Sequence, residues 1–249
     1  MQLKNTTILL VDDEPDLREI FAEWFRREGS RVLLAEHGAE ALRVMQANQV
    51  NVVVSDVRMP VMDGITMLRN IRSTHTYKPN VMFVTGFTDI EPREAYDLGV
   101  EALLSKPVER KQLIAAVARI LTPRDVLWHL PPIEKAEALL HVSFDSLAAA
   151  LSQGLLAFGR GGFCIHSTLD LEEGPVELLL DFAADQRRVT GQGMVHWKAS
   201  AEAQLGVEIT YIDANNLAWV LSLTAPNRSL SFIPRTTANA TTNTMMARV

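Results

Sequence analysis

The sequence of 249 residues contains a single cysteine, Cys164, and no apolar run long enough to cross a membrane. One cysteine excludes a framework of internal disulfide bonds and is typical of proteins from a reducing compartment. The acidic pair Asp12 and Asp13 interrupts the first apolar run, so the amino terminus lacks the residue order of a secretory signal. We therefore expect a cytoplasmic protein without membrane insertion.

Basic residues are scarce in the second half of the chain. Residues 123–249 carry 9 Lys and Arg against 13 Asp and Glu, and the whole chain has a net charge of −6. Contacts to nucleic-acid phosphates need a basic face, and no helix-turn-helix pattern with a basic second helix occurs there. Nucleic-acid binding is therefore disfavoured.

The first half alternates between two hydrophobic periods. Apolar runs fall near 7–12, 31–35, 51–55, 80–84 and 101–104, and helical patterns fall near 15–28, 38–47, 64–72, 89–98 and 108–121. Strands that alternate with helices of this length are typical of a parallel sheet with helices on both faces. The pattern predicts an α/β, doubly wound domain with a five-stranded parallel sheet over residues 1–122.

Several of these apolar runs end abruptly in polar residues. Asp12 and Asp13 follow the first run, Asp56 follows the third, Thr85 the fourth and Lys106 the fifth. Because the carboxyl ends of parallel strands meet at one edge, these side chains are expected to converge there. Carboxylate oxygens suit Mg²⁺, a lysine balances negative charge, and a carboxylate can act as a nucleophile toward a phosphoryl group.

These motifs, ILLVDDE, SDVRMPVMDG, VTG and SKP, occur in the order and at the strand ends of a known family. Residues 5 to about 122 resemble the receiver domain of a two-component response regulator, which has a flavodoxin-like fold. The resemblance implies that Asp56 accepts a phosphoryl group from a histidine kinase or phosphotransfer protein. It implies no further enzymatic activity than self-phosphorylation and self-dephosphorylation. Receivers also often form homodimers through one helical face.

The same resemblance assigns further roles. It implies that Asp13, Asp56 and the carbonyl of Arg58 bind Mg²⁺ directly, and Asp12 through water. Thr85 and Lys106 would form the switch pair. Leu103 stands where many receivers carry an aromatic switch residue. The positions that tune phosphoryl lifetime hold Arg58 and Phe87, neither of which positions attacking water well, so slow self-dephosphorylation is expected.

A proline-containing connector is expected over residues 123–154, because Pro123 and Pro131-Pro132 lie within about ten residues. Beyond it, Ile133 to His141 is predicted to be helical. A second helix is predicted to start near Ser143 and to end at Gly154.

Short β segments separated by Gly, Pro and acidic turns follow over residues 155–235 and predict a small antiparallel β-barrel. Their order resembles a PilZ domain, with GRGGF at the start of a strand. PilZ domains that bind cyclic di-GMP carry an arginine arm and an Asp/Asn-x-Ser-x-x-Gly motif. Here the arm has no arginine, and Ala157 and Gly159 replace the acid and the serine. Residues 236–249, rich in Thr and Asn, are predicted to be disordered.

Together these observations predict a phosphorelay response regulator. Its degenerate PilZ-like domain is expected to act on an unknown downstream protein through protein–protein contacts. An effector that integrates phosphorylation with cyclic di-GMP is the alternative, which the missing arginine arm disfavours. A DNA-binding regulator is a weaker alternative still.

Overall fold

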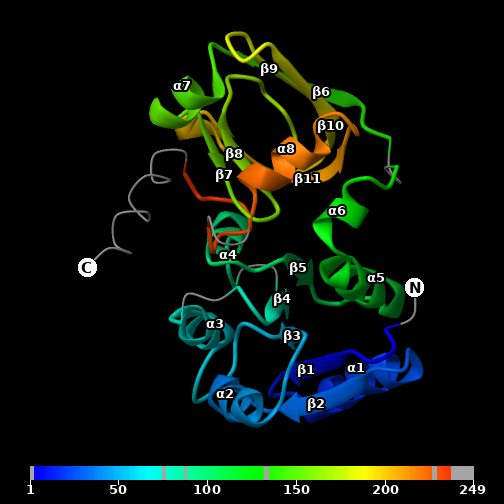
Figure 1. Ribbon diagram of the computed structural model, residues 1–249. Helices are drawn as coiled ribbons and strands as arrows, with labels where there is room; N and C mark the ends of the chain where they lie inside the picture. The colour runs from blue at the N-terminus through cyan, green and yellow to red at the C-terminus, as the bar shows by residue number, and fades with distance from the viewer. Residues whose placement is uncertain (1–2, 75–76, 87–88, 132–134, 226–228, 237–249) are drawn as a thin grey trace. The chain divides into compact units, whose positions relative to one another are not determined.

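A computed structural model describes residues 3–74, 77–86, 89–131, 135–225 and 229–236. The chain divides into two compact units, Met1–Thr122 and Pro123–Val249. Among the described residues, no helix combines the length and the apolar character needed to span a bilayer. Each unit has its own sheet (Figure 1). Each hydrophobic cluster of buried residues lies within one unit.

Unit 1 is built on a parallel sheet of five strands in the order β2-β1-β3-β4-β5, which confirms the predicted α/β architecture. The strands are β1 (Thr7–Val11), β2 (Arg31–Ala35), β3 (Val52–Ser55), β4 (Asn80–Thr85) and β5 (Ala102–Ser105). The central strands β3 and β4 are buried along their whole length, as expected for a sheet that is covered on both faces.

Five helices connect these strands: α1 (Pro15–Arg27), α2 (Gly38–Ala47), α3 (Gly64–Arg72), α4 (Pro92–Asp97) and α5 (Arg110–Leu121). The two faces of the sheet form separate cores. Ile8 and Leu10 of β1 pack with Phe25 of α1 and Val117 of α5. Leu9, between them, points to the opposite face and packs with residues of α2 and α3. The alternation along β1 therefore explains why both faces carry helices.

Local sequence signals fix the ends of these helices. Pro15 occupies the first turn of α1, and Gly29, with a φ of +86°, follows its end. Asp63 caps α3 by accepting a hydrogen bond from the backbone N–H of Thr66 at 2.6 Å. Pro15 and Asp63 thus mark where the loops that carry the acidic side chains of the site pass into helices.

Unit 2 contains a six-stranded sheet in the order β6-β9-β10-β11-β8-β7, which curls around a single core (Figure 1). The strands are β6 (Ala138–Phe144), β7 (Leu156–Phe158), β8 (Gly162–His166), β9 (Gly174–Phe182), β10 (Arg187–Ala199) and β11 (Gln204–Ile212). All neighbouring strands are antiparallel except β6 and β9, which are parallel. The expected antiparallel barrel is thus a curled sheet with one parallel edge pair.

Unit 2 also contains short helical elements, some of which contribute side chains to its core. They are α6 (Arg124–Leu127), α7 (Leu147–Ser152), the 3-10 turn η1 (Ser200–Glu202) and α8 (Leu217–Leu223). Val220 of α8 belongs to the core, and Trp219 packs edge-on against Phe182 of β9 at 5.6 Å between ring centroids. The curled sheet therefore encloses a packed core.

Two predictions for the region before the sheet are wrong. Residues 138–141, predicted to be helical, lie in β6, where Leu140 and Phe144 are buried against β9. Ser146, rather than Ser143, caps the following helix by accepting the N–H of Ala149. Residues assigned to a connector thus form an edge strand of the sheet. The predicted residues Pro132 and Ile133, and the tail 237–249, lie outside the described residues.

Candidate functional site

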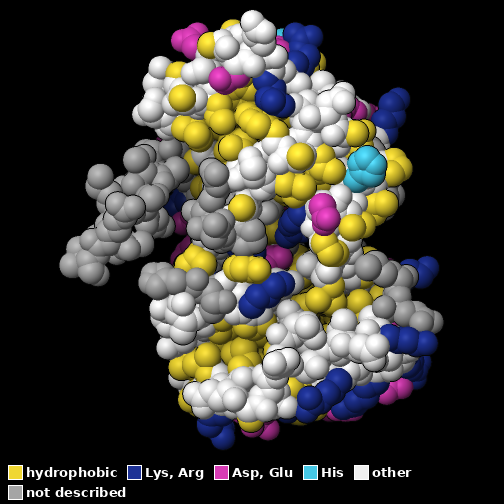
Figure 2. All heavy atoms as spheres, in the orientation of Figure 1, with side chains coloured by type: hydrophobic (Ala, Val, Ile, Leu, Met, Phe, Trp, Pro, Cys, Tyr) yellow, Lys and Arg dark blue, Asp and Glu magenta, His cyan; other side chains and the backbone are white. Residues whose placement is uncertain are grey.

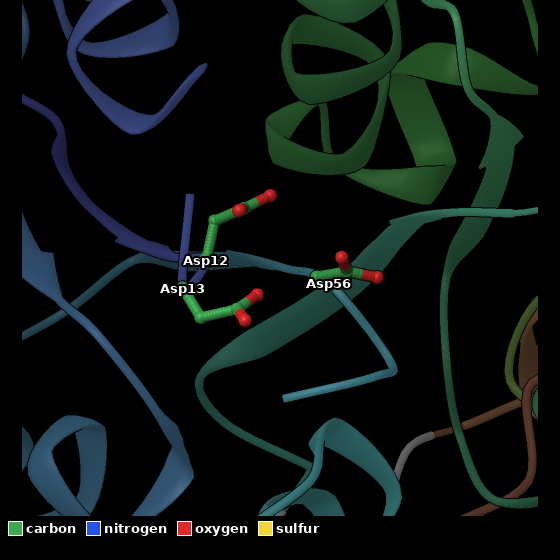
Figure 3. A group of neighbouring side chains, drawn as sticks. All are labelled: Asp12, Asp13 and Asp56. Atoms are coloured by element: carbon green, nitrogen blue, oxygen red, sulfur yellow. The ribbon is translucent and has the colours of Figure 1, made fainter. Parts of the chain in front are cut away.

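Three carboxylates meet at the carboxyl edge of the parallel sheet of unit 1. Asp12 and Asp13 follow β1, Asp56 follows β3, and one oxygen of each lies within 4.8 Å of the others. Figure 3 shows Asp12 and Asp13 extending toward the side on which Asp56 lies. Asp12 and Asp56 are buried, whereas Asp13 is exposed. Hard oxygen donors on a partly open edge fit Mg²⁺, which keeps several waters and uses few carboxylates.

Lys106, directly after β5, neutralises part of this acidic cluster. Its ammonium lies 2.7 Å from Oδ2 of Asp56 and 3.0 Å from Oδ2 of Asp12, and 3.6 Å from the carboxylate of Glu14. Burial alone would lower the pKa of Lys106, but the hydrogen bonds to Asp56 and Asp12 outweigh it and raise that pKa to about 12. The side chain is therefore a fixed positive charge at neutral pH.

Burial raises the pKa of Asp12 above its ordinary value, although hydrogen bonds from the Glu14 backbone and from Lys106 oppose the shift. The N–H of Glu14 donates to Oδ1 of Asp12 at 2.9 Å. A divalent cation among these carboxylates would favour their charged forms in the same way as Lys106 does. The cluster thus has the electrostatic character of a cation site.

Asp56 is held in a defined orientation by its own loop. Its Oδ1 accepts the backbone N–H of Val57 at 2.6 Å and lies 3.4 Å from the N–H of Arg58, so the Arg58 peptide lies beside the cluster. Ser55 donates to the Asp56 carbonyl at 2.6 Å. The hydroxyl of Thr85, at the end of β4, is 3.0 Å from Oδ1 of Asp56. The structure thus brings together the predicted metal-binding and switch residues, namely Asp12, Asp13, Asp56, Arg58, Thr85 and Lys106.

Comparison with known proteins gives the family of this unit. Residues 8–118 match the family described as the response regulator receiver domain. The first half of the chain is a response regulator receiver domain. The transcriptional regulatory protein GlrR of Escherichia coli is 34% identical over 167 residues, which cover 65% of this chain and 38% of GlrR. The sensor kinase CckA of Brucella abortus is 38% identical over 128 residues, 49% of this chain and 13% of the kinase.

Among solved structures, the chemotaxis response regulator CheY4 of Vibrio cholerae is 30% identical. The match covers 47% of this chain and 98% of that chain, with a TM-score of 0.43. The receiver match ends at residue 118, before unit 2 begins.

One residue of the receiver site, Asp89, was not predicted from the sequence. Asp89 lies four residues beyond Thr85 and accepts hydrogen bonds from the Thr85 hydroxyl at 2.8 Å and from the Gly86 N–H at 2.8 Å. The guanidinium of Arg58 donates to its other oxygen at 3.1 Å. The hydrogen bond from Thr85 is the main cause that lowers the pKa of Asp89 below its ordinary value. Phe87, the other predicted tuning position, lies outside the described residues.

The glycine-rich loop of unit 2, residues 159–162, packs against the segment 230–232. The N–H of Gly161 donates to the carbonyl of Phe232 at 2.9 Å, and the N–H of Arg160 donates to the carbonyl of Ser231 at 2.9 Å. The Phe232 ring is buried between Gly161 and the guanidinium of Arg124, which lies 5.0 Å from its centroid. The absence of a side chain at Gly161 therefore leaves the space that the Phe232 ring occupies.

Two neighbouring arginines of β10, Arg187 and Arg188, make contacts within unit 2. Arg187 bonds to Asn216 at 2.9 Å and lies over the ring of Trp219. Arg188 pairs with Asp181 at 2.7 Å. On the face shown in Figure 2, the lysine and arginine side chains of unit 2, which is coloured green to red in Figure 1, do not gather into one continuous patch.

Proposed function

We propose that this chain is a phosphorelay response regulator in which Asp56 accepts a phosphoryl group from a histidine kinase or phosphotransfer protein. The observation that carries the proposal is the position of Asp56. Its carboxylate belongs to an acidic cluster suited to Mg²⁺ and lies 2.7 Å from the fixed charge of Lys106.

In the proposed reaction, an oxygen of Asp56 attacks the phosphorus of a phosphohistidine. The new O–P bond forms as the N–P bond breaks, and the released imidazole takes up a proton. Asp13, Asp56 and the Arg58 carbonyl would hold Mg²⁺ directly and Asp12 through water. When bound, this ion would neutralise charge on the transferring phosphoryl oxygens. Lys106 is placed to pair with a phosphoryl oxygen, and the Thr85 hydroxyl is placed to donate to another.

The test is phosphorylation by a small phosphodonor such as acetyl phosphate, with and without Mg²⁺, followed by intact-mass spectrometry. The wild-type chain should gain one phosphoryl group only with Mg²⁺, and Asp56→Asn should gain none. Asp16→Asn is the matched control, because Asp16 is an exposed acid on the adjacent first turn of α1. Phosphorylation of Asp56→Asn at the wild-type level would refute the assignment.

For unit 2 we propose an output through protein–protein contacts from a PilZ-like sheet. The transcriptional regulators that resemble the receiver share only part of their length with this chain. Unit 2 carries 9 basic against 13 acidic residues, and this net negative charge disfavours contacts to DNA phosphates. The loop that would approach cyclic di-GMP in a PilZ domain has backbone N–H groups bonded to Ser231 and Phe232. This pairing argues for a packing role.

Calorimetric titration of cyclic di-GMP into the full chain, with and without beryllofluoride and Mg²⁺, tests this part of the proposal. No heat of binding is expected in either state. Micromolar binding would replace the protein-contact proposal with a two-input effector. Fluorescence anisotropy with a labelled random DNA duplex at low salt tests the nucleic-acid alternative in the same preparation.

A further inference from the structure

The hydroxyl of Thr85 faces two carboxylates but carries a single proton. Its oxygen is 3.0 Å from Oδ1 of Asp56 and 2.8 Å from Oδ2 of Asp89. A hydroxyl donates one strong hydrogen bond, so the two acceptors compete for it. Thr85 is 3% exposed, and water does not readily replace either acceptor.

Asp89 is held beside Thr85 by hydrogen bonds from the loops after β3 and β4. Three donors converge on its carboxylate: the Thr85 hydroxyl, the Gly86 N–H at 2.8 Å and the Arg58 guanidinium at 3.1 Å. The Asp89 side chain is only 19% exposed, whereas the Arg58 side chain is 72% exposed and reaches across from the loop after β3. An ion pair between the loops after β3 and β4 thus fixes Asp89 beside Thr85.

We infer that Asp89, clamped by Arg58, is a positioning residue that retains the Thr85 hydroxyl in the unphosphorylated state and so opposes activation. The inference rests on the proposed phosphorylation of Asp56. A phosphoryl group on Asp56 adds oxygens that accept the same proton, and its negative charge repels the Asp89 carboxylate. Activation therefore has to break the contact between Thr85 and Asp89, and the energy of that contact is subtracted from the binding of the phosphoryl group.

The inference predicts that removing Asp89 favours the activated state. A hydrogen bond to a charged group, when lost from the inactive state alone, corresponds to about a tenfold change in the activation equilibrium. Asp89→Ala should therefore bind beryllofluoride, in the presence of Mg²⁺, about tenfold more tightly than wild type. Asp89→Asn keeps a neutral acceptor and should lie between the two. Arg58→Ala, which releases the clamp, should shift the affinity in the same direction by a smaller factor.

The experiment is a titration of the full chain with beryllofluoride at saturating Mg²⁺, read by fluorine NMR of the bound species. Glu91→Gln is the matched control, because Glu91 is an exposed acid two residues away whose removal changes the charge equally. Mg²⁺ affinity is measured separately and should be equal in Asp89→Asn and Glu91→Gln. An altered beryllofluoride affinity with unaltered Mg²⁺ affinity separates retention of Thr85 from a general charge effect.

Each outcome has one meaning. If wild type binds beryllofluoride and both Asp89 variants bind it no more tightly than Glu91→Gln, the inference is overturned while the proposed function stands. If wild type itself shows no beryllofluoride binding at saturating Mg²⁺, the proposed function fails. Circular dichroism checks that Asp89→Ala is folded, and Asp89→Asn, which is nearly isosteric, decides the question if it is not.

Discussion

Substituting Gly161 with alanine should destabilise unit 2 through one contact. A Cβ atom at this position would lie 2.1 Å from Cζ of Phe232, 2.2 Å from Cε2 and 2.5 Å from Cε1. These distances are far below van der Waals contact, so the ring has to leave its place. The Phe232 backbone cannot follow without losing the hydrogen bond from Gly161 to its carbonyl.

The expected cost lies between two limits. Overpacking of a core costs about 1–3 kcal/mol, and complete removal of a buried phenylalanine ring costs about 3–5 kcal/mol. Alanine also reduces the conformational entropy of the unfolded chain, and this effect offsets about 0.4–1 kcal/mol of the destabilisation. We expect Gly161→Ala to lower the free energy of unfolding by about 3 kcal/mol. For a unit of this size that corresponds to a fall in Tm of about 10 °C.

Urea unfolding of the full chain, followed by tryptophan fluorescence, measures the change. A double-mutant cycle with Phe232→Ala isolates its cause. Phe232→Ala alone should cost about 3–5 kcal/mol, and adding Gly161→Ala to it should then cost nothing, because the clashing ring is gone. An equal cost for Gly161→Ala in the presence and absence of the Phe232 ring would refute the packing explanation of the glycine-rich loop.

Three further predictions concern charged groups. Hydrogen bonds from Asn216, Thr190 and Asn215 outweigh burial and lower the pKa of Asp213 below its ordinary value of 3.8. Its stabilisation is therefore complete above about pH 4 and is lost as the pH falls through the lower folded-state pKa, so acid titration of unfolding should show a smaller slope below pH 4 in Asp213→Asn. Asp13→Asn should abolish the increase in Tm that Mg²⁺ gives the receiver, measured by differential scanning calorimetry, and a retained increase would remove Asp13 from the metal site. Lys106→Met should bind Mg²⁺ more tightly, on the order of tenfold, since a neighbouring cation is removed, yet lose beryllofluoride binding; weaker Mg²⁺ binding by calorimetry would contradict the electrostatic account.

The receiver half was largely predictable because its sequence signals are local. Each strand is a continuous apolar run that ends in a polar residue, and helix signals such as Pro15 and Gly29 lie within a few residues of the boundaries that they set. Parallel topology then brings the strand ends together without further information. Asp56 and Lys106, 50 positions apart, were for that reason expected to meet, and their side chains are 2.7 Å apart.

The edge strand β6 could not be predicted in the same way. Residues 138–144, ALLHVSF, contain good helix formers, and the run preceding them is rich in Ala, Glu and Lys. The strand forms because it pairs in parallel with β9, from Ala138 beside Val176 to Phe144 beside Phe182, and buries Leu140 and Phe144. That pairing lies far along the chain, and tertiary contacts here override local propensity.

Glycine patterns were ambiguous for a similar physical reason. A missing Cβ allows any group to approach the backbone, whether a phosphate, a base or a neighbouring side chain, and the pattern GRGG does not distinguish them. The group that approaches Gly161 comes from Phe232, and its neighbour Gly162 lies against the carbonyl of Val207, where a Cβ would be 1.9 Å from the oxygen. The two glycines thus satisfy separate packing demands, one from a distant segment and one from the adjacent strand β11. Glycine spacing alone therefore predicts that some group approaches the backbone closely, and the side chains around the glycines determine which group that is.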